Sequence, residues 1–249
     1  MSKEPRASTR KRPERAASRV AKEIVSDINE RGLGPGAVLD PEHVMIEDYG
    51  VARATVREAL RYLEMQGALR IKAGPGGGPV VSVPDAAYLT SALSLQLQFA
   101  GATRRAVMDA RVAIFPVLVG LAAERATHQD IAALRQSLER IQDSVGELEA
   151  WALETRRFLE QVAIASKDLV LGLLVDSLHR MYARSGVPFD LKQRVASVRH
   201  MGAILANIEK GEATAARVES RKMMNAAASF SEKTSADVLD QPVEWLGID

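Results

Sequence analysis

The spacing of hydrophobic and polar positions on either side of Gly50 predicts two short helices. Apolar residues three and four apart mark their inward faces: Met45, Ile46 and Tyr49 in the first, then Val56, Ala59, Leu60 and Leu63 in the second. Asp40 can cap the first helix, with Pro41 at its first position. Gly50 supplies the left-handed residue that ends this helix and opens a tight turn into the next.

A hairpin is predicted directly after the two helices. Two short strands, 69–72 and 79–83, flank the glycine-rich run 74–78. Helix, tight turn, helix and hairpin together form the order of a winged helix-turn-helix, whose second helix fits the major groove of DNA. We therefore predict such a domain over residues 16–83.

From residue 85 onward the pattern is helical, without strand-like alternation of useful length. Seven segments are predicted, at about 85–100, 103–127, 128–143, 146–165, 168–184, 190–210 and 212–232. The breaks fall at Gly101, Thr127, Gly146, Lys167, the turn 185–188 and Gly211. The predicted fold class is mainly α, in which an all-helical effector and dimerisation domain of six or seven helices (84–234) follows the winged helix-turn-helix. Residues 1–15 are expected to form a disordered basic tail, and residues 235–249 a loosely packed C-terminal tail.

Arg53, Arg57 and Arg61 recur every four residues on the second short helix and so line one exposed stripe. A guanidinium group binds a phosphate or the edge of a guanine through two parallel hydrogen bonds. An arginine stripe by itself is more often a solvated face. Its conjunction with the turn and the hairpin in one compact unit is what favours DNA binding.

The net charge of +1 hides an asymmetry that agrees with DNA binding. Residues 1–83 hold 14 Lys and Arg against 11 Asp and Glu, whereas the remainder holds 19 against 21. Much of the basic excess lies before residue 20, in a segment that is either an arm along DNA or a solubilising tail. No cysteine is present, so disulfides and thiolate metal sites are excluded. No signal peptide and no apolar run near the ~20 residues of a membrane helix are recognised, so a cytoplasmic location without membrane contact is expected.

Several further residues extend the pattern of the first domain: Pro35-Gly36, Leu39, Glu42, Gly50-Val51, Arg53, Thr55-Val56-Arg57-Glu58-Ala59-Leu60 and Leu63. With them, residues 16–83 resemble the DNA-binding domain of GntR-type bacterial transcription regulators. The resemblance implies DNA contacts at His43, Arg53, Ala54, Thr55, Arg57, Arg61, Gly74 and Gly76. Three departures stand out. His43 replaces an arginine, which weakens one charged contact; Ala52 replaces a serine, which removes a helix cap; and Ala73 lies where a polar residue sometimes occurs.

The helical half carries a weaker resemblance. Met108–Asp130, together with Phe158, Ala165-Ser166 and the segment 200–216, resembles the FCD-type ligand domain of the FadR subgroup. Many such domains hold a divalent metal with an Asp, a His four residues later and two further histidines. Register on the matching residues puts Thr155, Leu159 and Met223 at three of these positions, and only His200 remains. One imidazole beside these side chains cannot hold a hard or borderline cation, so we predict no metal and no cofactor.

Leu159 and Met223 place apolar, adaptable surface where the family has polar ligands. The expected effector is therefore a larger hydrophobic molecule, such as the long-chain acyl-CoA of the FadR prototype or another hydrophobic acid. Arg111 is the candidate contact for its carboxylate or phosphate, with an ion pair to Asp109 or Glu124 as the alternative. The predicted effector-binding residues are Arg111, Thr155, Leu159, His200 and Met223.

The predicted partners are a double-stranded DNA operator, a small-molecule effector and a second copy of the chain, since a palindromic operator presents two half-sites. Candidates for the dimer interface are Leu89, Leu93, Leu95 and Leu97. The alternative function is a constitutive DNA-binding dimer with a degenerate pocket. An enzyme is disfavoured, because the four histidines lack catalytic neighbours and the glycine run lacks the lysine and helix of a phosphate-binding loop.

Overall fold

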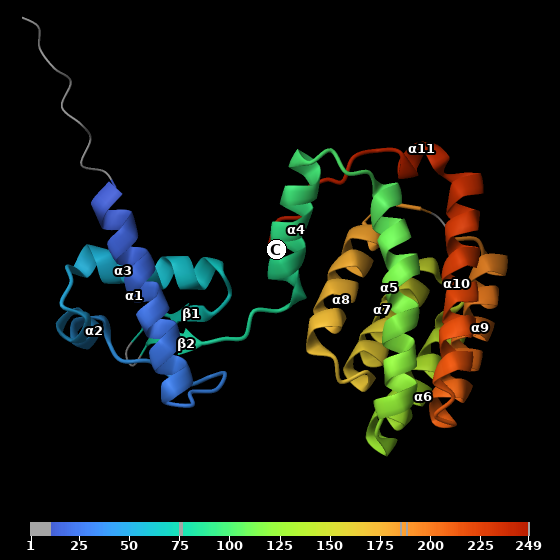
Figure 1. The fold of residues 1–249 in the computed structure, drawn as a ribbon, viewed down its shortest axis with the longest axis horizontal. Coiled ribbons are helices and arrows are strands. Elements are labelled where there is room, and N and C mark those ends of the chain that lie inside the picture. The colour runs from blue at the N-terminus through green and yellow to red at the C-terminus, as the bar shows by residue number, and fades with distance from the viewer. Residues whose placement is uncertain (1–10, 75–76, 185, 188, 249) are drawn as a thin grey trace, which may run out of the picture. The chain divides into compact units, whose positions relative to one another are not determined.

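The computed structural model describes residues 11–74, 77–184, 186–187 and 189–248, and the chain divides after Tyr88 into two compact units (Figure 1). The first unit carries the predicted winged helix-turn-helix and the second is an all-helical bundle. The predicted fold class is therefore confirmed. The two units are taken in turn.

The first unit contains three helices and a two-stranded antiparallel sheet: α1 (Lys11–Glu30), α2 (Glu42–Tyr49), α3 (Arg53–Met65), β1 (Leu69–Lys72) and β2 (Gly78–Val81). Leu69 pairs with Val81 in the hairpin, and both side chains are buried. Their partners in the core come from all three helices: Val20, Ala21, Ile24, Met45, Val56, Ala59, Leu60 and Leu63. The helix faces that the sequence predicts to point inward are thus the ones that pack in the core of this unit.

The turn between α2 and α3 depends on Gly50, as predicted. Its φ of 59° lies in the left-handed region, which costs glycine little. The prediction for the start of α2 is wrong: Pro41 occupies the N-cap position without a side-chain cap, and Asp40 instead accepts a 2.6 Å hydrogen bond from Arg31. The boundary of the basic tail also differs, because α1 already begins at Lys11. Residues 1–10 of that tail lie outside the described part of the chain.

The second unit is built from helices that match the seven predicted segments to within a few residues. They are α4 (Ala86–Phe99), which begins just before the division, α5 (Arg104–Arg125), α6 (His128–Ser144), α7 (Leu148–Ala165), α8 (Leu169–Ala183), α9 (Leu191–Glu209) and α10 (Ala213–Thr234). Their boundaries follow local signals. Thr127, Asp168 and Asp190 each cap the helix that follows, and Thr127 forms a reciprocal capping box with Asp130. One short helix, α11 (Ala236–Leu239), was not predicted.

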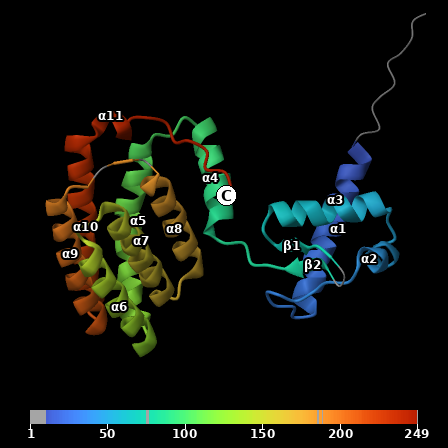
Figure 2. The same cartoon turned by 180° about the vertical axis from the view of Figure 1, so that it is seen from behind.

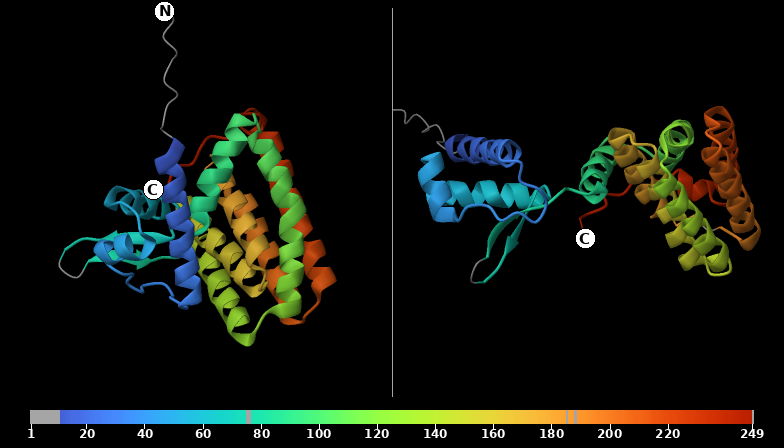
Figure 3. Two further views of the ribbon diagram at one scale, coloured as in Figure 1. Left: turned by 60° about the vertical axis from the view of Figure 1, so that its left-hand side comes forward. Right: turned by 90° about the horizontal axis from the view of Figure 1, so that it is seen from below.

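α5 is the central helix of the bundle and runs beside α10 (Figures 1 and 3). Phe115, Leu118 and Val119 on α5 are fully buried. The Arg217 side chain of α10 lies directly over Gly120, where a Cβ atom would approach its Nε to 1.9 Å. Among the described helices, α5 alone is long and apolar enough to span a membrane, although the sequence analysis did not single it out. Just over half of its apolar window (56%) is buried inside the bundle, as expected of a core helix.

The C-terminal segment packs against the bundle, so the expectation of a loosely packed tail is wrong. Leu239 and Val243 are almost completely buried. Pro242 forms an isolated antiparallel bridge with Thr103, which returns the chain from α11 to the start of α5. Figure 2 shows this segment continuing from α11 to α4.

Candidate DNA interface and ligand cavity

The candidate DNA interface is the exposed face of α3. Arg53, Arg57 and Arg61 are all exposed there, opposite the buried face of the same helix. The Arg57 side chain is 69% exposed, and its Nε lies 3.9 Å from the Glu42 carboxylate. An exposed ion pair of this length contributes little, so Arg57 remains available to an external phosphate or base.

The N-terminus of α3 adds a second feature to this face. Ala52 at the N-cap position provides no side-chain cap, and the neighbouring Ala54 is exposed whereas Thr55 is half-buried. The first-turn N–H groups of a helix lack intrahelical acceptors, and an N-terminus favours anions. The residues predicted at this helix start therefore surround a place that suits a DNA phosphate.

Two of the remaining predicted DNA contacts, His43 and Gly74, are exposed and lie on different elements. His43 lies on α2, and Gly74 has a φ of 95° at the start of the wing turn. Gly76 falls outside the described residues. The structure adds Arg70 and Lys72, two exposed cations that alternate along β1 and were not predicted. Their period of two along a strand is the signal that would have identified them.

A cavity of about 380 Å³ lies inside the second unit, between α5, α7, α8, α9 and α10. Its walls are mostly apolar and include Arg111, Glu149, Trp151, Thr155, Leu159, His179, Tyr182, Met201 and Met223. Trp151, Thr155 and Leu159 follow one face of α7 at intervals of four residues, so a single helix face presents all three. The volume falls in the range of small-molecule sites.

Four of the five predicted effector residues line this cavity: Arg111, Thr155, Leu159 and Met223. His200 is not among the residues that line this cavity. Its Nδ1 lies 2.6 Å from Glu219, on a half-exposed contact between α9 and α10, and its neighbour Met201 lines the cavity instead. Successive residues on a helix point about 100° apart, so a register error of one residue replaces one side chain with the other.

Arg111 is the charged group of the cavity. It is only 9% exposed, and its guanidinium carbon lies 3.9 Å from the centre of the Tyr182 ring, a cation–π contact. Neither alternative ion pair forms: Asp109 is exposed, and Glu124 accepts from Arg217 at 3.0 Å. Burial lowers the pKa of Arg111 to about 10, so the group stays charged at neutral pH. A buried charge therefore faces the cavity without an ion pair to any described carboxylate, although the exposed Glu149 also lines the cavity.

His179 is a cavity residue that sequence reasoning missed. It lies on α8, is 5% exposed, and its ring meets Phe115 edge-on at 5.3 Å. Burial, and then the nearby charge of Arg111, hold the pKa of His179 well below 6.5, so its imidazole is neutral. Nothing in the local sequence of α8 distinguished it from a core histidine.

Four residues that line the cavity each carry a buried polar atom without a hydrogen-bond partner: Arg111 Nε, Trp151 Nε1, Thr155 Oγ1 and His179 Nε2. Buried polar groups in native proteins are nearly always satisfied by protein, water or ligand. Three of these atoms come from side chains that donate, so the lining suits a ligand with oxygen acceptors.

The cavity lining holds one imidazole, that of His179, and not the set of several N or O ligands that a transition metal requires. Across the described residues, no three His, Cys, Asp or Glu side chains gather into a metal-binding group. The cavity residues that correspond to the metal-ligand positions of many FCD domains are Thr155, Leu159, Met201 and Met223. The absence of a metal remains a prediction.

We expect EDTA to leave the melting temperature and the DNA affinity unchanged. Zinc at about a hundredfold over a real dissociation constant would stabilise the protein by about 2.7 kcal/mol, which corresponds to a rise of roughly 5–11 °C for a protein of this size. Thermal scans with and without zinc measure this directly. Near-stoichiometric transition metal in protein purified without an affinity tag contradicts the prediction.

Comparison with known proteins supports both halves. The family model for "Bacterial regulatory proteins, gntR family" matches residues 16–78, and the FCD domain model matches residues 106–226. The HTH-type transcriptional regulator Rv0494 of Mycobacterium tuberculosis is 28% identical over 233 residues, which cover 90% of this chain and 93% of that protein. The Uxu operon transcriptional regulator of Escherichia coli is 33% identical over 112 residues, 42% of this chain and 40% of its own.

The fold is similar to a solved structure of Streptococcus agalactiae GntR. The TM-score is 0.71 at 21% identity, and the alignment covers 86% of this chain and 99% of that one. The two matched domains account for the winged helix-turn-helix and for the helical bundle around the cavity. The chain thus belongs to the GntR family of bacterial regulatory proteins, as a DNA-binding transcriptional regulator with an FCD domain and not an enzyme.

Proposed function

We propose that this regulator binds an operator through α3 and that a hydrophobic monocarboxylic acid in the cavity of the second unit modulates its DNA affinity. The observation that carries the proposal is Arg111, a buried charge facing an apolar cavity of about 380 Å³ without a carboxylate partner among the described residues. A carboxylate ligand supplies the missing charge and satisfies the orphaned donors around it. The proposed place of action is the cytoplasm, where the DNA lies.

The size of the cavity argues against a degenerate, non-sensing pocket. Leu159 and Met223 stand at positions where the family has metal ligands, yet they leave space for about twelve waters at the volume that a water occupies in the liquid. A pocket that has lost its ligand would be expected to fill with side chains, because unfilled space in a core is destabilising. The retained space favours an occupant.

The lining argues against a whole acyl-CoA. Of the lining residues that the structure describes, only Arg111 and Arg156 are cationic, and Arg156 lies 3.6 Å from Glu160. A CoA thioester brings three charged phosphates, whereas a free acid brings one carboxylate. The single arginine without an ion pair, Arg111, matches the one negative charge of a free acid.

Titration calorimetry with decanoate, decanol and decanoyl-CoA tests this proposal. We expect binding of decanoate and at least about tenfold weaker binding of decanol, which lacks the charge that Arg111 pairs with. Saturating decanoate should also change the affinity for the duplex that the wild-type protein enriches from random-sequence DNA. Equal affinity for decanol and decanoate, or unchanged DNA affinity with bound acid, contradicts the proposal.

We also propose that the protein is a two-fold homodimer in which α4 contributes to the interface. α4 contains no charged residue, and its outward side chains Leu95 and Phe99 are 38% and 87% exposed. Leu93 and Leu97 pack inside their own unit against Val243 and its neighbours, so they are withdrawn as interface candidates.

Light scattering at micromolar concentration is expected to give a dimer, and Phe99→Glu is expected to shift it toward the monomer, because a buried unpaired carboxylate is costly. Leu169→Glu provides a matched control, since Leu169 on α8 is 77% exposed. A wild-type monomer refutes the dimer. A dimer lost in the control but kept in Phe99→Glu refutes the role of α4.

A further inference from the structure

α4 is attached to its unit in an unusual way. It continues the chain from the winged helix-turn-helix into the second unit, yet within the described chain no other helix packs closely along it. Its inward face carries small polar residues beside Leu93 and Leu97, which pack against the cluster around Val243, and Ser94 on that face is fully buried. Something other than helix packing therefore holds much of α4 in place.

The C-terminal segment 241–246, here called the clasp, supplies those contacts. The backbone N–H of Trp245 donates to Gln98 Oε1 (2.7 Å), and its indole Nε1–H donates to Ser91 Oγ (3.0 Å). The backbone N–H of Leu246 donates to Ser94 Oγ (3.0 Å). Ser91, Ser94 and Gln98 lie on one face of α4, so the clasp satisfies the polar groups along that face.

The other end of the clasp is fixed to the bundle. The N–H of Val243 donates to the Ala102 carbonyl (2.9 Å), and the N–H of Arg104 donates to the Gln241 carbonyl (3.0 Å). The Val243 side chain is 4% exposed and belongs to a cluster with Val107, Leu178 and Met181. The clasp thus bridges α4 to α5 and α8.

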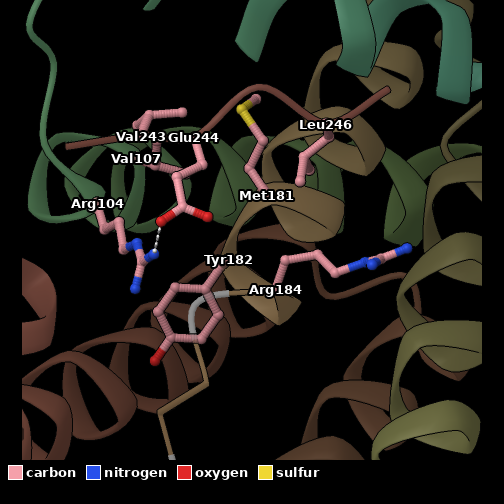
Figure 4. A pocket seen from close by; sticks show the side chains of 8 residues that line it. All are labelled: Arg104, Val107, Met181, Tyr182, Arg184, Val243, Glu244 and Leu246. Atoms are coloured by element: carbon pink, nitrogen blue, oxygen red, sulfur yellow. Dashed lines mark hydrogen bonds and ion pairs between the residues drawn. The ribbon is translucent and has the colours of Figure 1, made fainter. Parts of the chain in front are cut away.

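Tyr182 connects the clasp to the ligand cavity. Its ring stacks on Arg111 inside the cavity, and the same residue lines a small hollow of about 20 Å³ beneath the clasp, together with Val243, Glu244 and Leu246 (Figure 4). The Arg104–Glu244 ion pair (3.2 Å) closes this hollow. One aromatic residue therefore stacks on the charge that the proposed acid would bind and lines a hollow together with the segment that holds α4.

We propose that the clasp holds α4 against the bundle and transmits occupancy of the cavity to α4 through Tyr182. The transmission rests on the proposed function, whereas the holding of α4 does not. An acid that pairs with the in-plane N–H groups of Arg111 pulls on the guanidinium against which the Tyr182 ring is stacked. Any resulting shift of Tyr182 alters the hollow that it lines with Val243 and Leu246. Because α4 leads directly to the DNA-binding unit along the chain, its attachment is where a regulatory change is passed on.

Hydrogen–deuterium exchange of the full protein tests the holding of α4 without any ligand. A chain ending at Val243 keeps the buried Val243 but loses Glu244, Trp245 and Leu246. In this variant we expect amides of residues 89–99 to exchange at least about tenfold faster, while those of α5–α10 stay unchanged, because only α4 loses its partners. Exchange of α4 within about twofold of wild type overturns the proposal.

Point substitutions keep the test valid if the shortened chain fails to fold. Trp245→Ala removes the ring and the bond to Ser91 and should accelerate exchange of α4, whereas Trp245→Phe should have a smaller effect. Leu191→Ala is the matched control, because Leu191 is 53% exposed and Trp245 is 54% exposed. Acceleration of α4 by Leu191→Ala equal to that by Trp245→Ala also overturns the proposal.

A second arm adds decanoate and tests the transmission. In wild type, saturating decanoate should change α4 exchange by at least about threefold, and the chain ending at Val243 should bind decanoate with similar affinity but show no further change in α4. Binding without any change of α4 in wild type overturns the transmission, as does a full response in the shortened chain. If wild type binds no decanoate, the proposed function fails in its ligand class, and the ligand-free arm still decides whether the clasp holds α4.

Discussion

Alanine at Arg53 or Arg57 is expected to abolish specific operator binding while leaving helix content and oligomeric state intact. Both side chains are exposed on α3, so their loss removes no packing. A bidentate contact from arginine to a base is worth roughly 1–3 kcal/mol, and the proposed symmetric dimer would lose it twice, which corresponds to a loss of roughly thirtyfold to beyond ten-thousandfold in affinity. Mobility shifts against the enriched duplex measure the loss.

Arg135→Ala is the matched control for this experiment. Arg135 lies on α6 of the second unit, its side chain is 61% exposed, and its removal changes the net charge equally. Arg61→Ala should reduce the salt dependence of binding more than its sequence preference, as expected for a phosphate contact. Specific affinity within about twofold of wild type for Arg53→Ala or Arg57→Ala would exclude α3 as the recognition helix.

Replacing Arg111 with methionine is expected to have two effects of opposite sign. Affinity for decanoate should fall by roughly ten- to a hundredfold, because charge-assisted hydrogen bonds contribute about 1.5–3 kcal/mol. The ligand-free protein should become more stable by about 1–4 kcal/mol, since an apolar side chain replaces a buried charge that has no carboxylate partner among the described residues. Calorimetric titration and thermal unfolding measure the two effects.

Arg156→Met serves as the control, because Arg156 also lines the cavity but its side chain is 36% exposed and pairs with Glu160. Little change in either quantity is expected there. A purely structural Arg111 gives a different result: a lower melting temperature in Arg111→Met, with decanoate affinity close to that of wild type. That outcome would remove Arg111 from the ligand site.

The helices were predictable because their ends are encoded locally. Gly50 adopts the left-handed conformation that its turn demands, and Thr127 forms the capping box that starts α6. The C-terminal segment was not predictable in the same way. The pattern around Pro242 and Trp245 is typical of a loop, and the hydrogen bonds that fix the segment come from Ser91, Ser94 and Gln98, about 150 residues earlier in the chain.

The ligand cavity was predictable only to the precision of a helix register. Thr155 and Leu159 do line the cavity, because the motif around Phe158 fixes which face of α7 points inward. The alignment of α9 with the family pattern depended on a weaker motif. An error of one residue in that alignment assigned His200 to the cavity in place of Met201. His179 carried no motif at all, and its role depends on burial beside Arg111, which is a property of the tertiary structure.

The unpartnered guanidinium of Arg111 also has a consequence for how much of the protein a cell maintains. The empty protein carries a buried charge without a carboxylate partner in the described chain, so it is held below the stability that its apolar core allows. An acid bound at a hundred times its dissociation constant adds about 2.7 kcal/mol, and proteases act mainly on the unfolded fraction. The intracellular half-life of the regulator, and not only its affinity for DNA, should then rise with the supply of its effector.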